Sequence, residues 1–194
     1  MTVSSCVGLF VGGRGLRMGG VAKGNLASAS GERILERLVG ECRRALPAAP
    51  LVLVGAAEAY AELGLPALGD VPPGIGPLGG LNALLGFAER GGHAAALALA
   101  CDLPYLDARL VSRLATEAPA ALFLAPRSGE LWHTLAARYS VAARAAVGEA
   151  LAAGERALQR VVARLGDGAR ELAVDADEAR LLRDWDTPSD RERG

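Results

Sequence analysis

Residues 6–23 read CVGLFVGGRGLRMGGVAK, and this stretch decides the fold. The apolar run from Cys6 to Val11 predicts a buried β-strand. The strand leads directly into a loop with five glycines and three basic residues, Arg14, Arg17 and Lys23. Glycines let backbone amides approach a bound anion closely, and the basic side chains place positive charge beside it. The stretch therefore predicts a strand followed by a phosphate-binding loop.

The loop matches neither of two common phosphate-binding motifs. The dinucleotide fingerprint needs a glycine three residues after Gly15, where this chain has Met18. The Walker motif needs Gly-Lys before Ser or Thr, but Lys23 lies between Ala22 and Gly24. An exposed glycine-rich turn with solvated basic side chains is the alternative that carries no function. The place of the loop, directly after the first strand, favours nucleotide binding.

The composition limits the classes of partner. The 194 residues are 51% hydrophobic with a net charge of −1, which suits one domain with a large core. No long block of like charge is present, so a nucleic-acid partner is disfavoured. The three cysteines form neither a disulfide framework nor a CxxC motif, as is typical of a reducing compartment. With no signal peptide or membrane-spanning stretch in the sequence, we expect one cytoplasmic domain, residues 1–194, without a membrane partner.

Alternating patterns predict a Rossmann-like three-layer α/β sandwich with a mainly parallel sheet. Further strands are expected at residues 51–54, 93–100 and 171–174, and helices at 32–45, 57–63, 81–89, 107–117, 141–153 and 156–165. Residues 69–80 are rich in Gly and Pro and predict a loop. Residues 121–125 and 134–139 flank a turn at Arg127-Ser128-Gly129, which predicts an antiparallel hairpin added to the sheet.

A carboxylate follows the predicted strand 93–100. Asp102 comes directly after this strand, and Pro104 then stops further pairing. Such a fixed anion at the carboxyl end of a strand is suited to hold Mg²⁺ against a nucleotide phosphate. The alternative is that Asp102 caps the helix that begins near Asp107, but the gap is long for a simple cap.

Two further segments are candidates for the same edge of the sheet. Residues 73–80 read PGIGPLGG, which allows a base or ribose to pack against the backbone, with Asp70 upstream as an acceptor. An ordinary loop before a helix is the alternative. Near the end of the chain, Asp186 could complete a metal site with Asp102. Alternatively, Asp186 or Thr187 could cap a short helix with Pro188 at its first position.

The two histidines, His93 and His133, lie in no Ser/His/Asp or HExxH sequence arrangement, which disfavours nucleophilic or zinc hydrolysis.

Taken in order, these motifs resemble the molybdenum cofactor guanylyltransferases, within the Rossmann-like nucleotidyltransferases. The family pattern reads Leu-Ala-Gly-Gly-x-x-x-Arg-Met-Gly-x-x-x-Lys, Gly-Pro-Leu-x-Gly, Cys-Asp-x-Pro and Asn/Asp-x-Asn/Asp-Thr-Pro. Its counterparts here are Phe10-Val11-Gly12-Gly13, Arg17-Met18-Gly19, Lys23, Gly76-Pro77-Leu78-Gly79-Gly80, Cys101-Asp102-Leu103-Pro104 and Asp186-Thr187-Pro188. Phe10-Val11 replaces Leu-Ala, and Asp184 and Asp186 stand where asparagines are common in the family.

The resemblance implies transfer of GMP from GTP to the terminal phosphate of molybdopterin, with Mg²⁺ as cofactor and release of pyrophosphate. The implied nucleotide site comprises Phe10, Val11, Gly12, Gly13, Lys23, Asp70, Gly79 and Asp102. The implied catalytic groups are Arg17, Lys23 and Asp102, and the implied metal ligands are Asp102 and Asp186. Transient contact with molybdoenzymes or other cofactor-synthesis proteins is also implied.

The sequence leaves other functions open. A cytidylyltransferase, or a transferase for another small phosphorylated acceptor, would share the strand-end motifs, because acceptor pockets are built from variable loops. A protein of another class, a nucleotide- or cofactor-binding module without catalysis, is the third interpretation.

Overall fold

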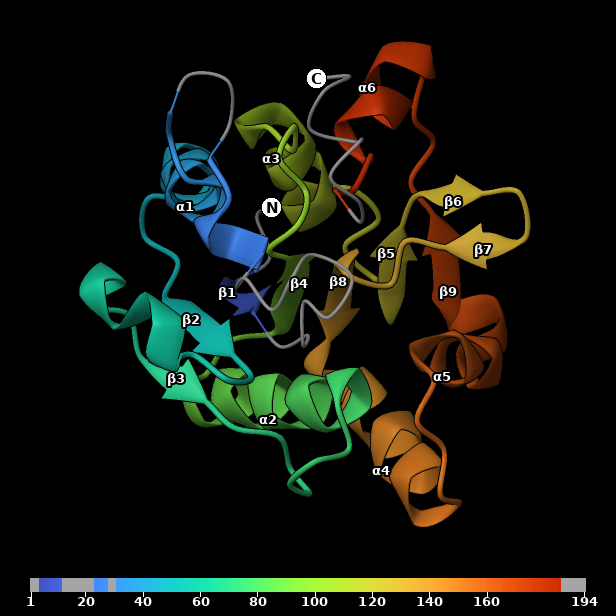
Figure 1. Cartoon of the computed structure of the whole chain (residues 1–194). Helices are drawn as coiled ribbons and strands as arrows, with labels where there is room; N and C mark the ends of the chain where they lie inside the picture. The colour runs from blue at the N-terminus through green and yellow to red at the C-terminus, as the bar shows by residue number, and fades with distance from the viewer. Residues whose placement is uncertain (1–3, 12–22, 28–30, 186–194) are drawn as a thin grey trace.

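The structure is a computed structural model that describes residues 4–11, 23–27 and 31–185, and of Lys23 only the backbone. A seven-stranded sheet, with strand order β3-β2-β1-β4-β8-β5-β9, lies at its centre (Figure 1). The strands are β1 (Ser5–Phe10), β2 (Leu51–Val54), β3 (Ala67–Leu68), β4 (Ala95–Ala100), β5 (Phe123–Ala125), β8 (Ala136–Ser140) and β9 (Ala169–Glu171). All neighbouring pairs are parallel except the two made by β8. The predicted mainly parallel α/β sandwich is confirmed.

Helices cover both faces of the sheet, so its central strands are buried on both sides. The helices α1 (Ile34–Ala45) and α3 (Ala108–Thr116) pack on one face. The other face carries α2 (Pro77–Arg90), α4 (Arg144–Ala152) and α5 (Leu158–Leu165). Side chains of β1 alternate between the two cores: Val7 and Leu9 face the first, and Cys6 and Phe10 the second.

Shorter elements complete the fold. They are the 3₁₀ helices η2 (Lys23–Asn25), η3 (Glu58–Leu63), η4 (Val141–Ala143) and η5 (Gly166–Gly168), and the helix α6 (Ala176–Leu181). Cys6, Cys42 and Cys101 are buried thiols rather than disulfides. No helix within the described ranges is long and apolar enough to cross a membrane.

The predicted hairpin is present, and it carries an additional small sheet. Its arms β5 and β8 pair antiparallel, with Phe123 opposite Tyr139. Between them, β6 (Arg127–Ser128) and β7 (Leu131–Trp132) form a separate two-stranded sheet. The Arg127 guanidinium lies 4.7 Å from the centre of the Trp132 ring, which in turn packs edge-on against Phe123. These contacts fix the tip of the hairpin to the sheet.

The prediction that residues 69–80 are all loop is wrong at its end, because α2 already begins at Pro77. Proline is well tolerated at the first helical position, since its missing N–H needs no partner there. Gly79 and Gly80, which suggested a loop, serve close packing instead. A Cβ on Gly80 would lie 2.8 Å from Cγ1 of Val54 and 3.0 Å from Cε1 of Phe10. Helix α2 can therefore press directly on β1 and β2.

Other boundaries also differ from the predictions. The last strand is β9, Ala169–Glu171, rather than residues 171–174, because its partner strand β5 ends at Ala125, opposite Glu171. The helix predicted at 57–63 is the 3₁₀ helix η3. Strand β3 and helix α6 were not predicted, although Asp175 and Glu178 form a capping box at the start of α6.

A buried arginine joins the reversed strand to helix α3. Arg138 on β8 is 1% exposed, and its guanidinium donates hydrogen bonds to the backbone carbonyls that close α3. These acceptors are the oxygens of Leu114 (3.2 Å), Ala115 (3.5 Å), Glu117 (2.7 Å) and Ala118 (2.5 Å). The carboxyl end of a helix carries partial negative charge, which compensates the buried cation.

Replacing Arg138 by methionine should lower the free energy of unfolding by about 2 to 4 kcal/mol, because the buried carbonyls lose their donor. Urea unfolding followed by circular dichroism measures the change. Arg43→Met, the same substitution at an exposed position of α1, should alter stability by less than about 0.5 kcal/mol. Equal stability of the two variants would contradict the role of Arg138.

Candidate functional site

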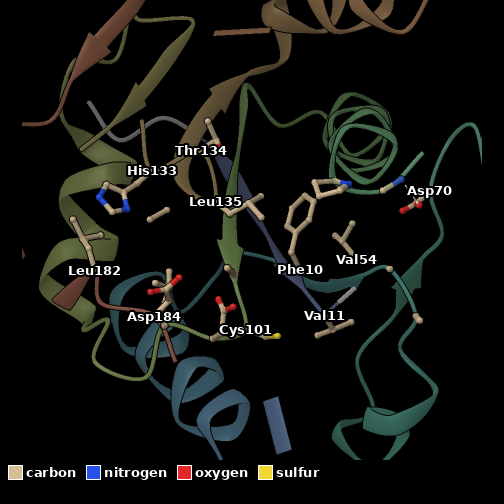
Figure 2. Close-up of a pocket in the computed structure, with 18 of the residues that line it drawn as sticks. Phe10, Val11, Val54, Asp70, Cys101, His133, Thr134, Leu135, Leu182 and Asp184 are labelled. Carbon is tan, nitrogen blue, oxygen red and sulfur yellow. Dashed lines mark hydrogen bonds between the residues drawn. The ribbon is translucent and has the colours of Figure 1, made fainter. Parts of the chain in front are cut away.

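A cavity of about 860 Å³ opens at the carboxyl ends of the parallel strands (Figure 2). It lies at the switch point of the sheet, where the chain order runs from β1 outward to β3 and then returns to β4 on the other side of β1. Ligands of open α/β sheets bind at such a point. The lining residues are Phe10, Val11, Val54, Gly55, Ala56, Asp70, Gly74, Gly76, Pro77, Ala100, Cys101, Asp102, Leu103, His133, Thr134, Leu135, Ala136, Leu182 and Asp184.

Backbone hydrogen bonds join the strand ends that form the floor of this cavity. They run from Gly55 N to Leu68 O (2.8 Å), from Val11 N to Val54 O (2.9 Å), from Cys101 N to Phe10 O (3.1 Å) and from Ala100 N to Leu135 O (2.7 Å). Each bond connects one strand end to the next across the sheet. The floor is therefore rigid, as a preorganised binding site requires.

Asp70 organises one side of the cavity. Its Oδ2 accepts a hydrogen bond from the backbone N–H of Gly76 at 2.9 Å. Gly76 is the N-cap of α2 and has φ +83°, a conformation that favours glycine. Gly79 is buried in the first turn of α2, where a Cβ would lie 3.0 Å from Cβ of Asp70. The sequence-predicted pair of Asp70 and Gly79 is thus brought together, with Asp70 at the cavity and Gly79 packed behind it.

Asp102 follows β4 and lines the cavity. The alternative that it caps the next helix is wrong, because Asp107 is the N-cap of α3 and accepts a hydrogen bond from Leu110 N at 2.9 Å. The predicted role of Asp102 in metal binding stays a prediction, for a residue that lines the cavity and does not cap α3.

The chain returns to Asp102 near its end. Trp185 donates a backbone hydrogen bond to the carbonyl of Asp102 at 3.1 Å, and its indole N–H donates to the hydroxyl of Tyr105 at 3.1 Å. The Trp185 side chain is 4% exposed and packs with Leu26 and Ile34. The described tail thus folds back over the sheet, as the predicted pairing of Asp102 with Asp186 requires, although Asp186 itself lies outside the described residues.

Tyr60 fixes the segment that contains Lys23. Its hydroxyl accepts a hydrogen bond from the backbone N–H of Gly24 at 3.1 Å, and Asn25 Nδ2 donates to the carbonyl of Ala59 at 3.2 Å. Burial is the main cause that raises the pKa of Tyr60 to about 12, so its hydroxyl stays neutral. The predicted residues Gly12, Gly13 and Arg17 lie outside the described residues, as does the side chain of Lys23.

His133 and Asp184 form the side of the cavity opposite Asp70, with Phe10, Val11 and Cys101 between them (Figure 2). A hydrogen bond of 2.8 Å joins Nε2 of His133 to Oγ of Ser128. Burial lowers the pKa of His133, and the nearby negative charge of Asp184 partly opposes that shift. The fold thus brings together the Ser, His and Asp that the sequence spacing did not suggest. Ser128 is exposed and does not line the cavity, so its hydroxyl orients the ring rather than serving as a nucleophile there.

Among the side chains that line the cavity, the carboxylates are the groups suited to bind a magnesium ion. Within the described ranges, no three His, Cys, Asp or Glu side chains are grouped as a ready-made metal site. Mg²⁺ commonly binds through one or two carboxylates and completes its shell with phosphate oxygens and water. Asp102, as a carboxylate on the cavity floor, meets that requirement.

The chain is similar to known nucleotidyltransferases over most of its length. Residues 8–181 match the family model described as the MobA-like NTP transferase domain. The molybdenum cofactor guanylyltransferase of Pseudomonas fluorescens (strain SBW25) is 35% identical, over 86% of this chain and 83% of that protein. Its counterpart in Rhodobacter capsulatus is 34% identical over the same shares. The crystal structure of molybdopterin-guanine dinucleotide biosynthesis protein A from Archaeoglobus fulgidus has the same fold, with a TM-score of 0.75, 22% identity, and coverage of 96% of this chain and 95% of that one.

Replacing Asp184 by asparagine should lower the pKa of His133, because the carboxylate that favours the protonated ring is removed. NMR titration of the imidazole protons measures this directly, since the chain has only two histidines. His93, which lies before the amino end of β4 and outside the cavity lining, provides the reference signal in the same samples. An unchanged pKa of His133 would show that Asp184 exerts no field on the ring.

Proposed function

Because the chain belongs to the MobA-like NTP transferase domain family, we propose that it transfers GMP from GTP to the terminal phosphate of molybdopterin and releases pyrophosphate. Membership of the family makes the chain a nucleotidyltransferase; the nucleotide, the acceptor and the metal are our proposal. The observation that carries it is the cavity at the switch point, lined by the matched motifs that contain Phe10-Val11, Gly76-Pro77 and Asp102. Relatives of 34–35% identity that bear the name molybdenum cofactor guanylyltransferase support the choice of GTP and molybdopterin.

The proposed reaction needs little covalent chemistry from the protein. An oxygen of the acceptor phosphate attacks the α-phosphorus of GTP and forms a phosphoanhydride bond. The bond between the α-phosphorus and the oxygen that bridges to the β-phosphate breaks, and pyrophosphate leaves with that electron pair. The acceptor phosphate is already ionised near neutral pH, so no general base is required. Catalysis therefore depends on in-line positioning and on neutralising the charge that moves onto pyrophosphate.

The side of the cavity near Asp70 suits the nucleotide. Gly55, Ala56, Gly74 and Gly76 line it without bulky side chains, so a base and ribose can lie against the backbone. Gly55 has φ +107°, which again favours glycine. We assign the base and ribose to this side, with Asp70 as their acceptor and the triphosphate extending toward Asp102.

Asp102, together with Asp186, would hold Mg²⁺, which when bound screens the negative charge of the phosphates during transfer. Lys23 and Arg17 would supply further positive charge. Lys23 is the only lysine among the 21 basic residues of the chain; all the others are arginine. An ammonium group is a compact point charge, whereas guanidinium is a planar fork, so a single lysine in an arginine-rich chain supports a specific phosphate contact.

The activity can be tested with purified protein, Mg²⁺, molybdopterin and each nucleoside triphosphate in turn, with pyrophosphate release as the readout. Release with GTP supports the proposal, and release with CTP alone would instead indicate a cytidylyltransferase. GTP binding by calorimetry without turnover on any phosphorylated acceptor would indicate a binding module. No release with any nucleotide overturns the proposed activity.

Asp102→Asn should reduce turnover by about two orders of magnitude or more, because the negative charge that would attract the metal is removed while size is kept. The thermal midpoint should stay within a few degrees of the parent. Asp107→Asn is the matched control: asparagine caps helices as well as aspartate does, so α3 and activity should both be preserved. Full activity in folded Asp102→Asn protein would show that the metal assignment is wrong.

Lys23→Ala should cost about 2 to 4 kcal/mol in the transition state, measured as a fall in kcat/KM for GTP, because it removes a contact that strengthens as charge moves onto pyrophosphate. Lys23→Arg should recover only part of that loss, since the guanidinium cannot reproduce the ammonium geometry. If kcat/KM is the same in all three proteins, Lys23 is a solvated surface charge.

A further inference from the structure

The charges that line the cavity are uneven. Its described lining contains three carboxylates, at Asp70, Asp102 and Asp184, and a single group able to carry positive charge, His133. A phosphate monoester carries up to two negative charges near neutral pH. Carboxylates repel such a group, so an acceptor phosphate in this cavity needs a hydrogen-bond donor or a cation beside it.

His133 lies where an acceptor, rather than the nucleotide, would be placed. It shares one side of the cavity with Leu182 and Asp184, while Asp70 lies on the other (Figure 2). With the base and ribose beside Asp70, the α-phosphate comes near Asp102 on the floor. A group that attacks in line from the opposite direction then arrives from the side of His133.

The position of the His133 ring is fixed by its surroundings. Ser128 Oγ bonds Nε2 at 2.8 Å, and the backbone N–H of His133 donates to the carbonyl of Pro126 at 3.0 Å. Gln159 holds the preceding residue, Trp132, by accepting from its N–H at 3.3 Å and donating to its carbonyl at 2.7 Å. A side chain held in this way loses little conformational entropy when it binds a ligand.

We propose that His133, oriented by Ser128, binds the terminal phosphate of the acceptor and holds it in line with the α-phosphorus of the nucleotide. This role rests on the nucleotidyl transfer proposed above. In that transfer His133 forms no covalent bond and gives up no proton; it donates a hydrogen bond to a non-attacking phosphate oxygen. Burial lowers the pKa of His133 and the charge of Asp184 only partly opposes that shift, but the neutral ring still has one N–H that can donate this hydrogen bond.

The test compares His133→Gln with His93→Gln, the same substitution at the other histidine of the chain. His93 lies before the amino end of β4, with Nδ1 at 3.0 Å from Ser4 Oγ, and outside the cavity lining. In His133→Gln the KM for molybdopterin should rise about tenfold or more, the loss expected for one hydrogen bond to a charged group. The KM for GTP should change by less than about twofold, because the residue does not face the nucleotide. His93→Gln should change neither constant.

Ser128→Ala provides a second variant at an exposed position, where folding is not at risk. It should raise the KM for molybdopterin by a smaller factor than His133→Gln, with the KM for GTP again unaffected. If the wild-type protein is active and His133→Gln has the same KM for molybdopterin as the wild type, the role of His133 is overturned while the proposed function stands.

Calorimetric binding of molybdopterin separates the two proposals if the wild-type protein shows no turnover. The proposed function then fails, but binding that is weakened about tenfold by His133→Gln and unchanged by His93→Gln still supports a phosphate contact at His133. Equal binding by all three proteins, or no binding by the wild type, overturns it.

Discussion

The backbone hydrogen bonds that join the carboxyl ends of neighbouring strands hold the site together. Val11 bonds to Val54, Cys101 to Phe10, and Ala100 to Leu135, so the end of β1 is fixed between β2 and β4 and the return segment before β8 is fixed to β4. Each of these residues also lines the cavity. These backbone hydrogen bonds at the strand ends therefore form the floor of the site. They also fix the backbone from which the residues after each strand extend.

Two segments close the site from the side of the reversed strand, and both depend on contacts far apart in the sequence. The tail reaches the floor because Trp185 bonds to Asp102 and Tyr105. The return segment of the hairpin reaches it because Leu135 accepts a backbone hydrogen bond from Ala100, and Gln159 of α5 holds the backbone of Trp132. The side near Asp70 is instead a local structure, in which the Asp70 carboxylate accepts a hydrogen bond from Gly76, the residue that precedes α2. One side of the cavity is thus built locally and the other by long-range packing.

This difference explains what the sequence could and could not predict. The first strand, the acid after β4 and the added hairpin were predicted correctly, since each leaves a local pattern of apolar residues and turn residues. The start of α2 was missed because glycine signals a loop locally, whereas Gly80 is required by contact with Val54 and Phe10. The grouping of Ser128, His133 and Asp184 was missed because only the folded tail brings Asp184 to the hairpin. The functional roles of all the predicted site residues, Asp70 and Asp102 included, stay predictions.

The placement of the two tryptophans gives the protein an intrinsic optical label. Trp132 lies on the hairpin beside His133, and Trp185 lies on the tail beside Asp102, so both indoles sit on the segments that flank the same half of the cavity. Indole emission depends on the polarity around the ring, and no other tryptophan contributes to the spectrum. Neither ring lines the cavity itself, so we expect the emission of the unmodified chain to change when a bound molecule shifts the hairpin or the tail rather than through direct contact with an indole.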